Sequence, residues 1–458
     1  MDIKDKKVAV IGLSKRSGVA ATKLLVKNGA RVIVSDIKSR DKLQKELEML
    51  QDFNLEFDLG GHSEKSLESD LIVVSPGVPL DLPFFDKAKK KGIPVISEVE
   101  LAYNFTNAGI IAVTGTNGKT TTTSLIGHIL KRADIGKVKI AGNIGVSLCN
   151  VVSELTADDW IVAEISSFQL ETISNFRPNI SVYLNFTPDH LDRHHTEKAY
   201  WKAKKNIFKN QTKSDYALIN IDDKQVVKSV KDCQAEVLGI SDKKEVEQGA
   251  FIKNDHLMIR KKSNHTETIM PVAEIPLPGR HNIMNVAFAA LVSRLMGIAI
   301  DNIKDEIINF KLDEHRLTEI GQSNSNVLIV DDSKATNPDA AIKALNTYNR
   351  PIVLIAGGQD RNADFEHLAQ IISENVKSLV LLGETKNIIK NAVIKQDFDK
   401  IQQASNMEEA VKLASRETNK GDCLMLSPGC PSWDMYPSYK KRGNLFQKEV
   451  KKHYNFED

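Results

Sequence analysis

The sequence has little cysteine, few aromatic residues and no excess of charge of either sign. Its 458 residues include four cysteines, and their spacing does not resemble that of paired metal ligands. Lys and Arg number 62 against 60 Asp and Glu, which gives a formal net charge of +2. Binding along a nucleic-acid backbone requires a basic excess, so we expect no nucleic-acid partner. A long chain with few thiols is typical of a reducing compartment.

Long apolar runs are absent as well. No window reaches the ~18 continuous apolar residues that a membrane-spanning helix requires. The chain begins with charged residues that lead directly into an apolar, strand-like stretch, with no pattern of a secretion signal. We therefore expect no membrane insertion and a cytoplasmic location. Nothing in the sequence demands an assembly larger than a monomer.

The hydrophobic pattern predicts an α/β protein of about three domains, at roughly 150 residues per domain. Short β-branched runs alternate with helical patterns, which is typical of parallel sheets covered by helices. We predict three consecutive domains, at 1–108, 109–311 and 312–458: a central P-loop-type ATPase domain flanked by N- and C-terminal Rossmann-like parallel sheets. The expected strands are 8–11, 30–35, 71–74, 110–113, 160–165, 180–184, 327–330, 352–356, 378–382 and 423–426. The expected helices are 19–28, 43–50 and 282–296, and 222–268 is expected to form a small meandering β region.

A phosphate-binding loop is the sharpest local signal. The apolar run 110–113 leads into Thr114-Gly-Thr-Asn-Gly-Lys-Thr120, and a helical pattern opens at Lys119. Backbone N–H groups at a helix N-terminus bind anions, and glycines let the backbone approach phosphate oxygens. Lys119 supplies a charge for the β- and γ-phosphates, and the Thr120 hydroxyl can hold Mg²⁺. The loop predicts binding of ATP, although Val113 stands where the usual motif has its first glycine.

Two further residues end predicted strands in the same domain. Glu164 closes the strand Trp160–Glu164, and His190 follows the strand Val182–Asn185 in Pro188-Asp-His190. Ligands of α/β sheets bind at the carboxyl ends of the strands. A carboxylate and an imidazole beside a phosphate loop are suited to holding metal ions and developing negative charge. We expect both residues in the active site.

These segments together resemble the Mur ligase family, the ATP-dependent amide-forming enzymes of peptidoglycan precursor assembly. The resemblance covers essentially the whole chain, and the motifs occur in the family's order. They are Thr114–Thr120, Gly142–Gly145, Glu164–Gln169, Asp189–Arg193, Gly279–Asn282, His315-Arg316 and Asp331–Asn337.

Within the family, the last domain is most similar to members that add D-glutamate. The distinguishing segments are Asp332–Asn337, Ser427–Tyr436 and Arg442-Gly443. The implied substrates are ATP, UDP-N-acetylmuramoyl-L-alanine and D-glutamate, with Mg²⁺ as cofactor. The implied chemistry is attack of the alanine carboxylate on the γ-phosphorus, followed by displacement of phosphate by the D-glutamate amine. A Mur-type ligase with a different amino-acid acceptor is the alternative.

The resemblance also implies roles for individual residues. Lys204 matches the lysine that the family carbamylates, although the alignment also allows Lys205; from charge alone, both lysines would lie on an exposed helix face.

The implied catalytic residues are Lys119, Glu164, His190 and Lys204, with Thr120, Glu164, His190 and carbamylated Lys204 at the metal ions. The implied ATP contacts are Gly115, Thr116, Asn117, Gly118, Lys119, Thr120, Thr121, Asn282, Arg316 and Asp332. The implied UDP-substrate contacts are Ser14, Lys15, Arg16, Ser17, Asp36, Ser75, Gly77 and Asn143. The implied D-glutamate contacts are Lys334, Thr336, Arg361 and Ser427, and Arg361 stands where many members have lysine.

Other function classes explain fewer of these residues. Gly12–Gly18 and Asp36, 24 positions after the first glycine, form an incomplete dinucleotide-binding motif, with Ser14 in place of the second glycine. This motif would suit an NAD-dependent dehydrogenase. That hypothesis leaves the phosphate loop and the C-terminal motifs unexplained. A folylpolyglutamate synthase would share the phosphate loop but lacks an N-terminal UDP-binding unit of this kind. A non-catalytic nucleotide sensor would not need Glu164, His190 and Lys204 together.

Overall fold

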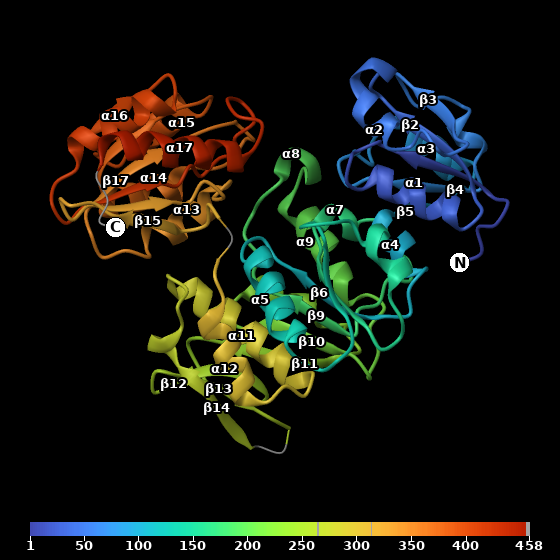
Figure 1. Cartoon of the computed structure of the whole chain (residues 1–458), viewed down its shortest axis with the longest axis horizontal. Helices are drawn as coiled ribbons and strands as arrows, with labels where there is room; N and C mark the ends of the chain where they lie inside the picture. The colour runs from blue at the N-terminus through green and yellow to red at the C-terminus, as the bar shows by residue number, and fades with distance from the viewer. Residues whose placement is uncertain (263–264, 313, 455–458) are drawn as a thin grey trace. The chain divides into compact units, whose positions relative to one another are not determined.

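Three β-sheets covered by helices make up the computed structural model, which describes residues 1–262, 265–312 and 314–454 (Figure 1). The chain packs as two units. The first contains Met1–Phe186, Lys198–Val272 and Asn285–Ile307, and with them two of the sheets. The second contains Thr187–Glu197, Ala273–Met284 and Ile308–Asp458, and with them the third sheet. Two short segments from the middle of the sequence therefore belong to the C-terminal unit.

The N-terminal sheet, drawn blue in Figure 1, is entirely parallel, with the strand order β3-β2-β1-β4-β5. This is the doubly wound Rossmann strand order without its sixth strand, and the order reverses between β1 and β4. Alternate side chains of β1 enter two different cores, with Val8 and Val10 on one face and Ala9 and Ile11 on the other. The strands are β1 (Lys7–Ile11), β2 (Arg31–Asp36), β3 (Glu56–Leu59), β4 (Leu71–Val74) and β5 (Val95–Ser97), and the helices are α1 (Gly18–Lys27), α2 (Gln44–Glu48) and α3 (Pro83–Lys90).

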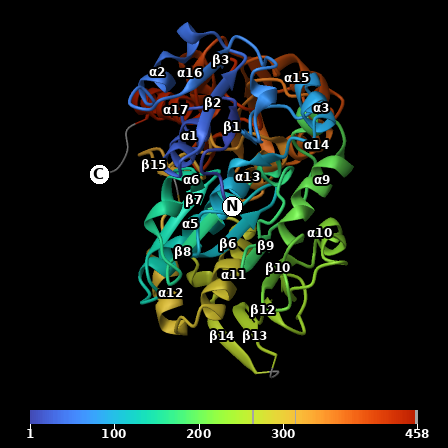
Figure 2. The same cartoon turned by 90° about the vertical axis from the view of Figure 1, so that its right-hand side faces the viewer.

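The second sheet of the first unit has nine strands in the order β14-β13-β12-β11-β10-β9-β6-β8-β7. Its strands are parallel up to β12, and β13 and β14 extend it antiparallel at the edge seen in Figure 2. The strands are β6 (Gly109–Thr114), β7 (Val138–Gly142), β8 (Trp160–Glu164), β9 (Ile180–Tyr183), β10 (Tyr216–Asn220), β11 (Glu236–Ser241), β12 (Gly249–Lys253), β13 (His256–Arg260) and β14 (Thr266–Pro271). The helices around it are α4 (Glu98–Tyr103), α5 (Lys119–Lys131), α6 (Leu148–Val151), α7 (Ser167–Leu170), α9 (Glu197–Lys205), α10 (Lys224–Ser229), α11 (Arg280–Leu295) and α12 (Ile300–Asn309).

The sheet of the second unit has six strands in the order β15-β16-β20-β17-β18-β19, and only β15 runs antiparallel. It is buried on both faces: Leu354 lies in a core with residues of α13, α14 and α15, and Val353 in a core with residues of α16 and α17. The elements are β15 (Thr318–Gln322), β16 (Leu328–Asp331), β17 (Ile352–Ala356), β18 (Val376–Leu381), β19 (Ile401–Gln403), β20 (Cys423–Leu426), α8 (Leu191–His194), α13 (Pro338–Leu345), α14 (Glu366–Asn375), α15 (Lys386–Ile394), α16 (Met407–Glu417) and α17 (Tyr439–His453).

The α/β fold with a parallel N-terminal sheet and a central phosphate-loop sheet is confirmed, and the C-terminal sheet is parallel except for its edge strand β15. The apolar runs 71–74, 352–356 and 423–426 coincide with β4, β17 and β20, because strands buried on both faces are continuously hydrophobic. Short or half-exposed strands such as β3 and β19 gave no such signal. The exact domain boundaries stay predictions. Within the described residues, no helix is both long enough and apolar enough to cross a membrane.

Candidate active site

The phosphate loop lies between β6 and α5 in the first unit, as the sequence predicts. The chain leaves β6 at Thr114, and α5 begins at Lys119 with Gly118 as its N-terminal cap at φ 85°. The side chain of Asn185, in the segment after β9, holds this loop in place. The Asn117 N–H donates to Asn185 Oδ1 at 2.9 Å, and Asn185 Nδ2 donates back to the Asn117 carbonyl at 3.0 Å. The first turn of α5 thus presents its N–H groups from a rigid loop, which suits an anion.

Two lysines from different elements converge on the same carbonyl of this loop. Lys119 Nζ donates to the Gly115 carbonyl at 2.9 Å, and Lys204 Nζ donates to it at 2.7 Å. Lys204 is only 1% exposed, and its Nζ lies 4.7 Å from the centre of the Tyr200 ring. Lys205 instead points to the surface, where it pairs with Asp232 at 2.8 Å. The exposed-face interpretation is therefore wrong for Lys204, which is buried beside the phosphate loop, whereas Lys205 lies at the surface. Which of the two is carbamylated stays a prediction.

Glu164 ends β8 beside the phosphate loop, since it pairs in register with Val113 of β6. The carboxylate is buried; its Oε1 accepts from Asn143 Nδ2 at 2.8 Å, and its Oε2 has no hydrogen-bond partner among the described residues. An orphaned buried carboxylate oxygen is costly unless a cation or water satisfies it. With the Thr120 hydroxyl in the first turn of α5, this oxygen fits the hard oxygen ligands that Mg²⁺ prefers.

The predicted UDP-substrate residues gather where the strand order of the N-terminal sheet reverses. Ser14 Oγ accepts from the N–H groups of Ser17 and Gly18 at 3.2 Å each, so the turn after β1 is closed by its own side chain. Ser75, after β4, donates from its hydroxyl to the Gly12 carbonyl at 2.6 Å and joins the two strand ends. Asp36 at the end of β2 accepts from the Leu13 N–H at 2.7 Å and is buried.

Arg16 links this turn to the strand that carries Asn143. Its Nη2 donates to the carbonyl of Gly142, the last residue of β7, at 2.6 Å. Burial lowers the pKa of Arg16 from its usual value, and the nearby carboxylates of Glu164 and Glu98 oppose that shift. The guanidinium therefore lies within the electrostatic reach of the orphaned carboxylate. Lys15 is exposed.

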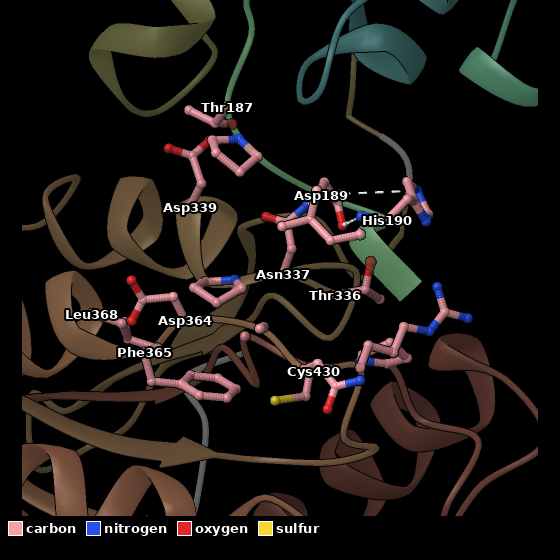
Figure 3. Close-up of a pocket in the computed structure, with 18 of the residues that line it drawn as sticks. Thr187, Asp189, His190, Thr336, Asn337, Asp339, Asp364, Phe365, Leu368 and Cys430 are labelled. Atoms are coloured by element: carbon pink, nitrogen blue, oxygen red, sulfur yellow. Dashed lines mark hydrogen bonds and ion pairs between the residues drawn. The ribbon is translucent and has the colours of Figure 1, made fainter. Parts of the chain in front are cut away.

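In the second unit, a cavity of about 340 Å³ is lined by His190, Thr336 and Arg361. Figure 3 shows His190 and Thr336 at this cavity. His190 sits in a left-handed conformation at φ 55°, and its Nε2 lies 3.8 Å from Asp189 Oδ2. The same Asp189 oxygen accepts from Asn337 Nδ2 at 3.1 Å, so the His190 loop is bonded to the segment before α13. The sequence analysis did not single out Asp189 or Asn337, although both lie inside the quoted motifs.

Asp332 and Ser427 lie at the ends of neighbouring strands, β16 and β20. Ser427 is buried and donates to Asp332 Oδ2 at 2.9 Å, and the Leu317 N–H donates to Asp332 Oδ1 at 3.2 Å. Burial raises the pKa of Asp332 to about 7, against the opposing effects of the Ser427 hydrogen bond and the Arg316 charge. Arg316 Nε is buried without a hydrogen-bond partner in the described part of the chain.

The four residues expected to bind D-glutamate do not all line one cavity. Thr336 and Arg361 line it, whereas the Ser427 hydroxyl is committed to Asp332. Lys334 Nζ lies 5.7 Å from the centre of the Tyr439 ring, and Lys334 is not among the residues lining the cavity. Asn282, expected at the adenosine, is buried and donates to the Pro278 carbonyl at 2.6 Å.

Sequence reasoning missed a buried acidic residue next to the substrate segments of the first unit. Glu98 begins α4, and its Oε1 accepts from Gln169 Nε2 at 2.8 Å. Burial raises the pKa of Glu98 to about 7. A glutamate in the first turn of a helix, directly after a serine cap, is typical of an ordinary helix start, so no sequence signal distinguished it.

Comparison with known proteins matches three family models along the chain. Residues 6–97 match the Mur ligase MurD-like N-terminal domain, 113–293 the Mur ligase middle domain, and 315–430 the Mur ligase glutamate ligase domain. The UDP-N-acetylmuramoylalanine–D-glutamate ligase of Clostridioides difficile (strain 630) is 44% identical over 453 residues, which cover 98% of this chain and 99% of that protein. The protein of the same name from Alkaliphilus oremlandii (strain OhILAs) is 43% identical, with the same coverage.

Solved structures share the fold at much lower identity. A pseudomurein peptide ligase type C from Methanothermus fervidus has a TM-score of 0.60 at 18% identity, and the match covers 97% of this chain and 100% of that one. The UDP-N-acetylmuramate-alanine ligase MurC of Thermotoga maritima has a TM-score of 0.60 at 17% identity, with 98% and 99% covered.

Proposed function

Because this chain belongs to the Mur ligase family, we propose that it is an ATP-dependent ligase that joins D-glutamate to UDP-N-acetylmuramoyl-L-alanine in peptidoglycan precursor synthesis. The observation that carries the proposal is the 44% identity to a ligase of that name across 98% of the chain. The three matched family domains and the phosphate loop agree with it. The substrates are soluble nucleotides and an amino acid, so we place the reaction in the cytoplasm. We also propose that the enzyme is a monomer.

The ATP phosphates would lie on the loop from Gly115 to Thr121. The N–H groups at the start of α5 and the ammonium of Lys119 would face the phosphate oxygens, where the helix dipole adds positive potential. Lys119 Nζ now donates to carbonyls of its own loop and would turn to the phosphates. Asn282, Arg316 and Asp332 are proposed to contact the rest of the nucleotide.

A divalent cation such as Mg²⁺ would be held by Thr120 and Glu164, and His190 and carbamylated Lys204 are proposed as further ligands. When bound, it would neutralise phosphate charge so that a carboxylate can approach the γ-phosphorus. The burial of Lys204 beside the phosphate loop supports its proposed role. A carbamate on this lysine would place a negative charge there that could bind the cation. In the described residues no three His, Cys, Asp or Glu side chains cluster tightly enough to form a metal site by themselves.

The UDP part of the substrate would bind where the N-terminal sheet reverses its strand order. Ser14 to Ser17 are proposed to face the diphosphate, with Asp36 and Ser75-Pro-Gly77 on the uracil side. The hydrogen-bonded turn of Ser14 and the Ser75–Gly12 link support this by holding both strand ends in place. Asn143, now bonded to Glu164, would help hold the sugar-diphosphate.

The acceptor D-glutamate carries two carboxylates and requires cations and hydroxyl groups. Arg361 and Thr336, which line the 340 Å³ cavity, are proposed to bind it, and Lys334 supplies a nearby positive charge. Ser427 would act through Asp332, to which its hydroxyl is bonded.

The proposed chemistry follows from the poor reactivity of a free carboxylate. An alanine carboxylate oxygen forms a bond to the γ-phosphorus while the bond to the β-phosphate oxygen breaks, and ADP leaves. The resulting acyl phosphate is attacked by the neutral amine of D-glutamate; the amide forms, the carbon–oxygen bond to phosphate breaks, and the amine loses a proton. The products are the amide, ADP and inorganic phosphate.

The deciding experiment measures phosphate release with ATP, Mg²⁺ and UDP-N-acetylmuramoyl-L-alanine, comparing D-glutamate with L-glutamate, D-aspartate and meso-diaminopimelate. We expect release with D-glutamate alone, together with the dipeptide product by mass spectrometry. Release with another amino acid would point to a Mur-type ligase with a different acceptor. Binding of NADH without ATP turnover would favour the dehydrogenase hypothesis instead.

Replacing Lys119 by alanine should abolish product formation, because the ammonium that faces the phosphates is removed. Binding of the UDP substrate, measured by calorimetry, should stay within about twofold of the unaltered protein, because Lys119 is expected to contact only ATP. Lys205→Ala, which removes a surface lysine paired with Asp232, is the control and should keep full turnover. Turnover by the Lys119→Ala protein would exclude this loop as the ATP site.

A further inference from the structure

Arg361 is a cation of the second-unit cavity that no described carboxylate neutralises. It lines the cavity with Thr336, and in the described part of the chain its guanidinium forms no ion pair. Its one recorded partner is an aromatic ring: the guanidinium carbon lies 4.7 Å from the centre of the Trp433 ring. A guanidinium without a carboxylate, at the wall of a cavity, is suited to an anionic ligand.

Trp433 is unusually exposed for an indole. Its side chain is 60% exposed, although large aromatic side chains are normally buried for most of their surface. Packing in a hydrophobic core therefore does not explain its position. The stacked cation does, because the ring face attracts a guanidinium and leaves that group's planar edge exposed.

The backbones that carry the two side chains are bonded to each other. The Gln359 N–H donates to the Pro431 carbonyl at 2.9 Å, and the Gly357 N–H donates to the Pro428 carbonyl at 2.8 Å. Gly358 lies so close that an added Cβ would stand 2.3 Å from the Pro431 oxygen. The loop after β17 and the loop after β20 thus form one fixed platform.

A third loop ties the residues next to the stacked pair. The Glu384 N–H donates to Asp434 Oδ2 at 3.0 Å, and the Asp360 N–H donates to Glu384 Oε2 at 3.1 Å. Asp434 follows Trp433 and Asp360 precedes Arg361, so the backbone is held on both sides of the contact. The stacking is therefore supported by the loops and does not depend on the two side chains alone.

We propose that Trp433 is a positioning residue that holds the Arg361 guanidinium edge-on to the cavity, where it binds one carboxylate of the acceptor amino acid. The inference rests on the proposed function, because it takes the acceptor to be D-glutamate. Stacking fixes the plane of the guanidinium and directs two parallel N–H groups at a carboxylate. A lysine at position 361 would offer a point charge and could not be oriented in this way.

The first test is the Michaelis constant for D-glutamate in Trp433→Ala and Trp433→Phe. We expect Trp433→Ala to raise it about two- to fivefold, the range that an exposed cation–π contact supports. The turnover number and the constants for ATP and the UDP substrate should stay unchanged, and Trp433→Phe should restore most of the affinity. A loss of turnover with an unchanged constant for D-glutamate would overturn the proposal.

The second test asks whether Trp433 acts through Arg361. In an Arg361→Ala background, Trp433→Ala should cause no further rise in the Michaelis constant for D-glutamate, because the group that it positions is gone. An equal rise in both backgrounds would overturn the proposal, since Trp433 would then contact the ligand by itself.

A third test needs no turnover. Arg361→Ala should change the tryptophan emission of the protein, and it should leave the emission of Trp433→Phe, which keeps Trp160 and Trp201, unchanged. If Arg361→Ala did not change the emission of the protein that keeps Trp433, the positioning role would be overturned even in an active ligase. If the turnover of the wild-type protein did not depend on D-glutamate, the proposed function and its acceptor would be overturned instead. Failure of the positioning role and failure of the proposed function are therefore distinguishable.

Discussion

At the scale of single residues, the first unit contains a buried carboxyl group that the proposed chemistry does not use. Glu98 is buried at the start of α4 and is bonded to Gln169, which belongs to the segment after Glu164. Burial without a cationic partner in hydrogen-bond contact disfavours the charged form and raises the pKa of Glu98 to about 7. Its protonation is therefore linked to folding.

Glu98→Gln should stabilise the protein at pH 8 and have a much smaller effect near pH 4.5. The folded state holds the Glu98 proton up to about pH 7, whereas the unfolded chain releases it near 4.5. Wild-type stability is thus lowered as the pH rises through this window, and the amide removes that loss while still accepting from Gln169. The expected gain at pH 8 is about 1–3 kcal/mol.

The measurement is the free energy of unfolding in urea at pH 4.5, 6 and 8 for both proteins. Glu48→Gln, at an exposed position in α2, is the matched control. A constant difference between wild type and Glu98→Gln at all three pH values would exclude Glu98 as the linked group.

At the scale of elements, the junction of the phosphate loop and α5 depends on the backbone of one glycine. Gly118 caps α5 at φ 85°, and a Cβ added there would stand 2.5 Å from Asn285 Oδ1 of α11. Asn285 Oδ1 also accepts from the Thr122 hydroxyl at 3.2 Å, so its place is fixed. The start of α5 and α11 are therefore packed closely enough to require glycine.

Gly118→Ala should lower the free energy of unfolding by about 2–3 kcal/mol and weaken ATP binding. The left-handed conformation costs alanine about 1 kcal/mol, and the clash adds to it. Gly92→Ala is the matched control: Gly92 is also left-handed, at φ 71°, but nothing lies within 4 Å of an added Cβ. Equal losses in the two variants, measured by chemical denaturation, would mean that the close approach to Asn285 has no energetic weight.

At the scale of the whole molecule, the second unit contains its own hydrophobic cores. Both cores of the six-stranded sheet are formed by residues between Leu317 and Tyr454, one on each face. The segments 187–197 and 273–284 belong to this unit but contribute no residue to either core. The continuous part of the unit therefore has what a domain needs to fold alone.

A fragment of residues 308–458 should fold and unfold cooperatively. We expect a sigmoidal urea transition followed by circular dichroism, because the sheet is covered on both faces without any other part of the chain. Val353→Ala, which opens a cavity in one core, should lower the free energy of unfolding by about 1–2 kcal/mol and so move the midpoint to a lower urea concentration. A gradual transition without a midpoint would show that the C-terminal unit depends on the rest of the chain.

Whether a feature of this protein can be predicted from its sequence depends on whether the residues that form it are close together in the chain. The phosphate loop was predictable because a buried strand, two glycines and a helix start are consecutive in the chain. The family resemblance singles out Lys204 and Ser427 as site residues, but their burial was not predictable. It is decided by partners from other elements: the Gly115 carbonyl for Lys204, and Asp332 for Ser427. A lysine in a basic segment looks exposed until a distant loop covers it.

The α/β class, the alternation of β-branched strands with helices, the phosphate loop and the family can all be derived from the amino-acid sequence alone. These follow from short-range periodicity and from residues adjacent in the chain. Three other features appear only in the folded chain: Glu164 keeps an orphaned oxygen, two loops place Arg361 over Trp433, and 187–197 packs with the C-terminal unit. Each of those depends on contacts between segments far apart in sequence, and burial and charge pairing arise only when such segments meet.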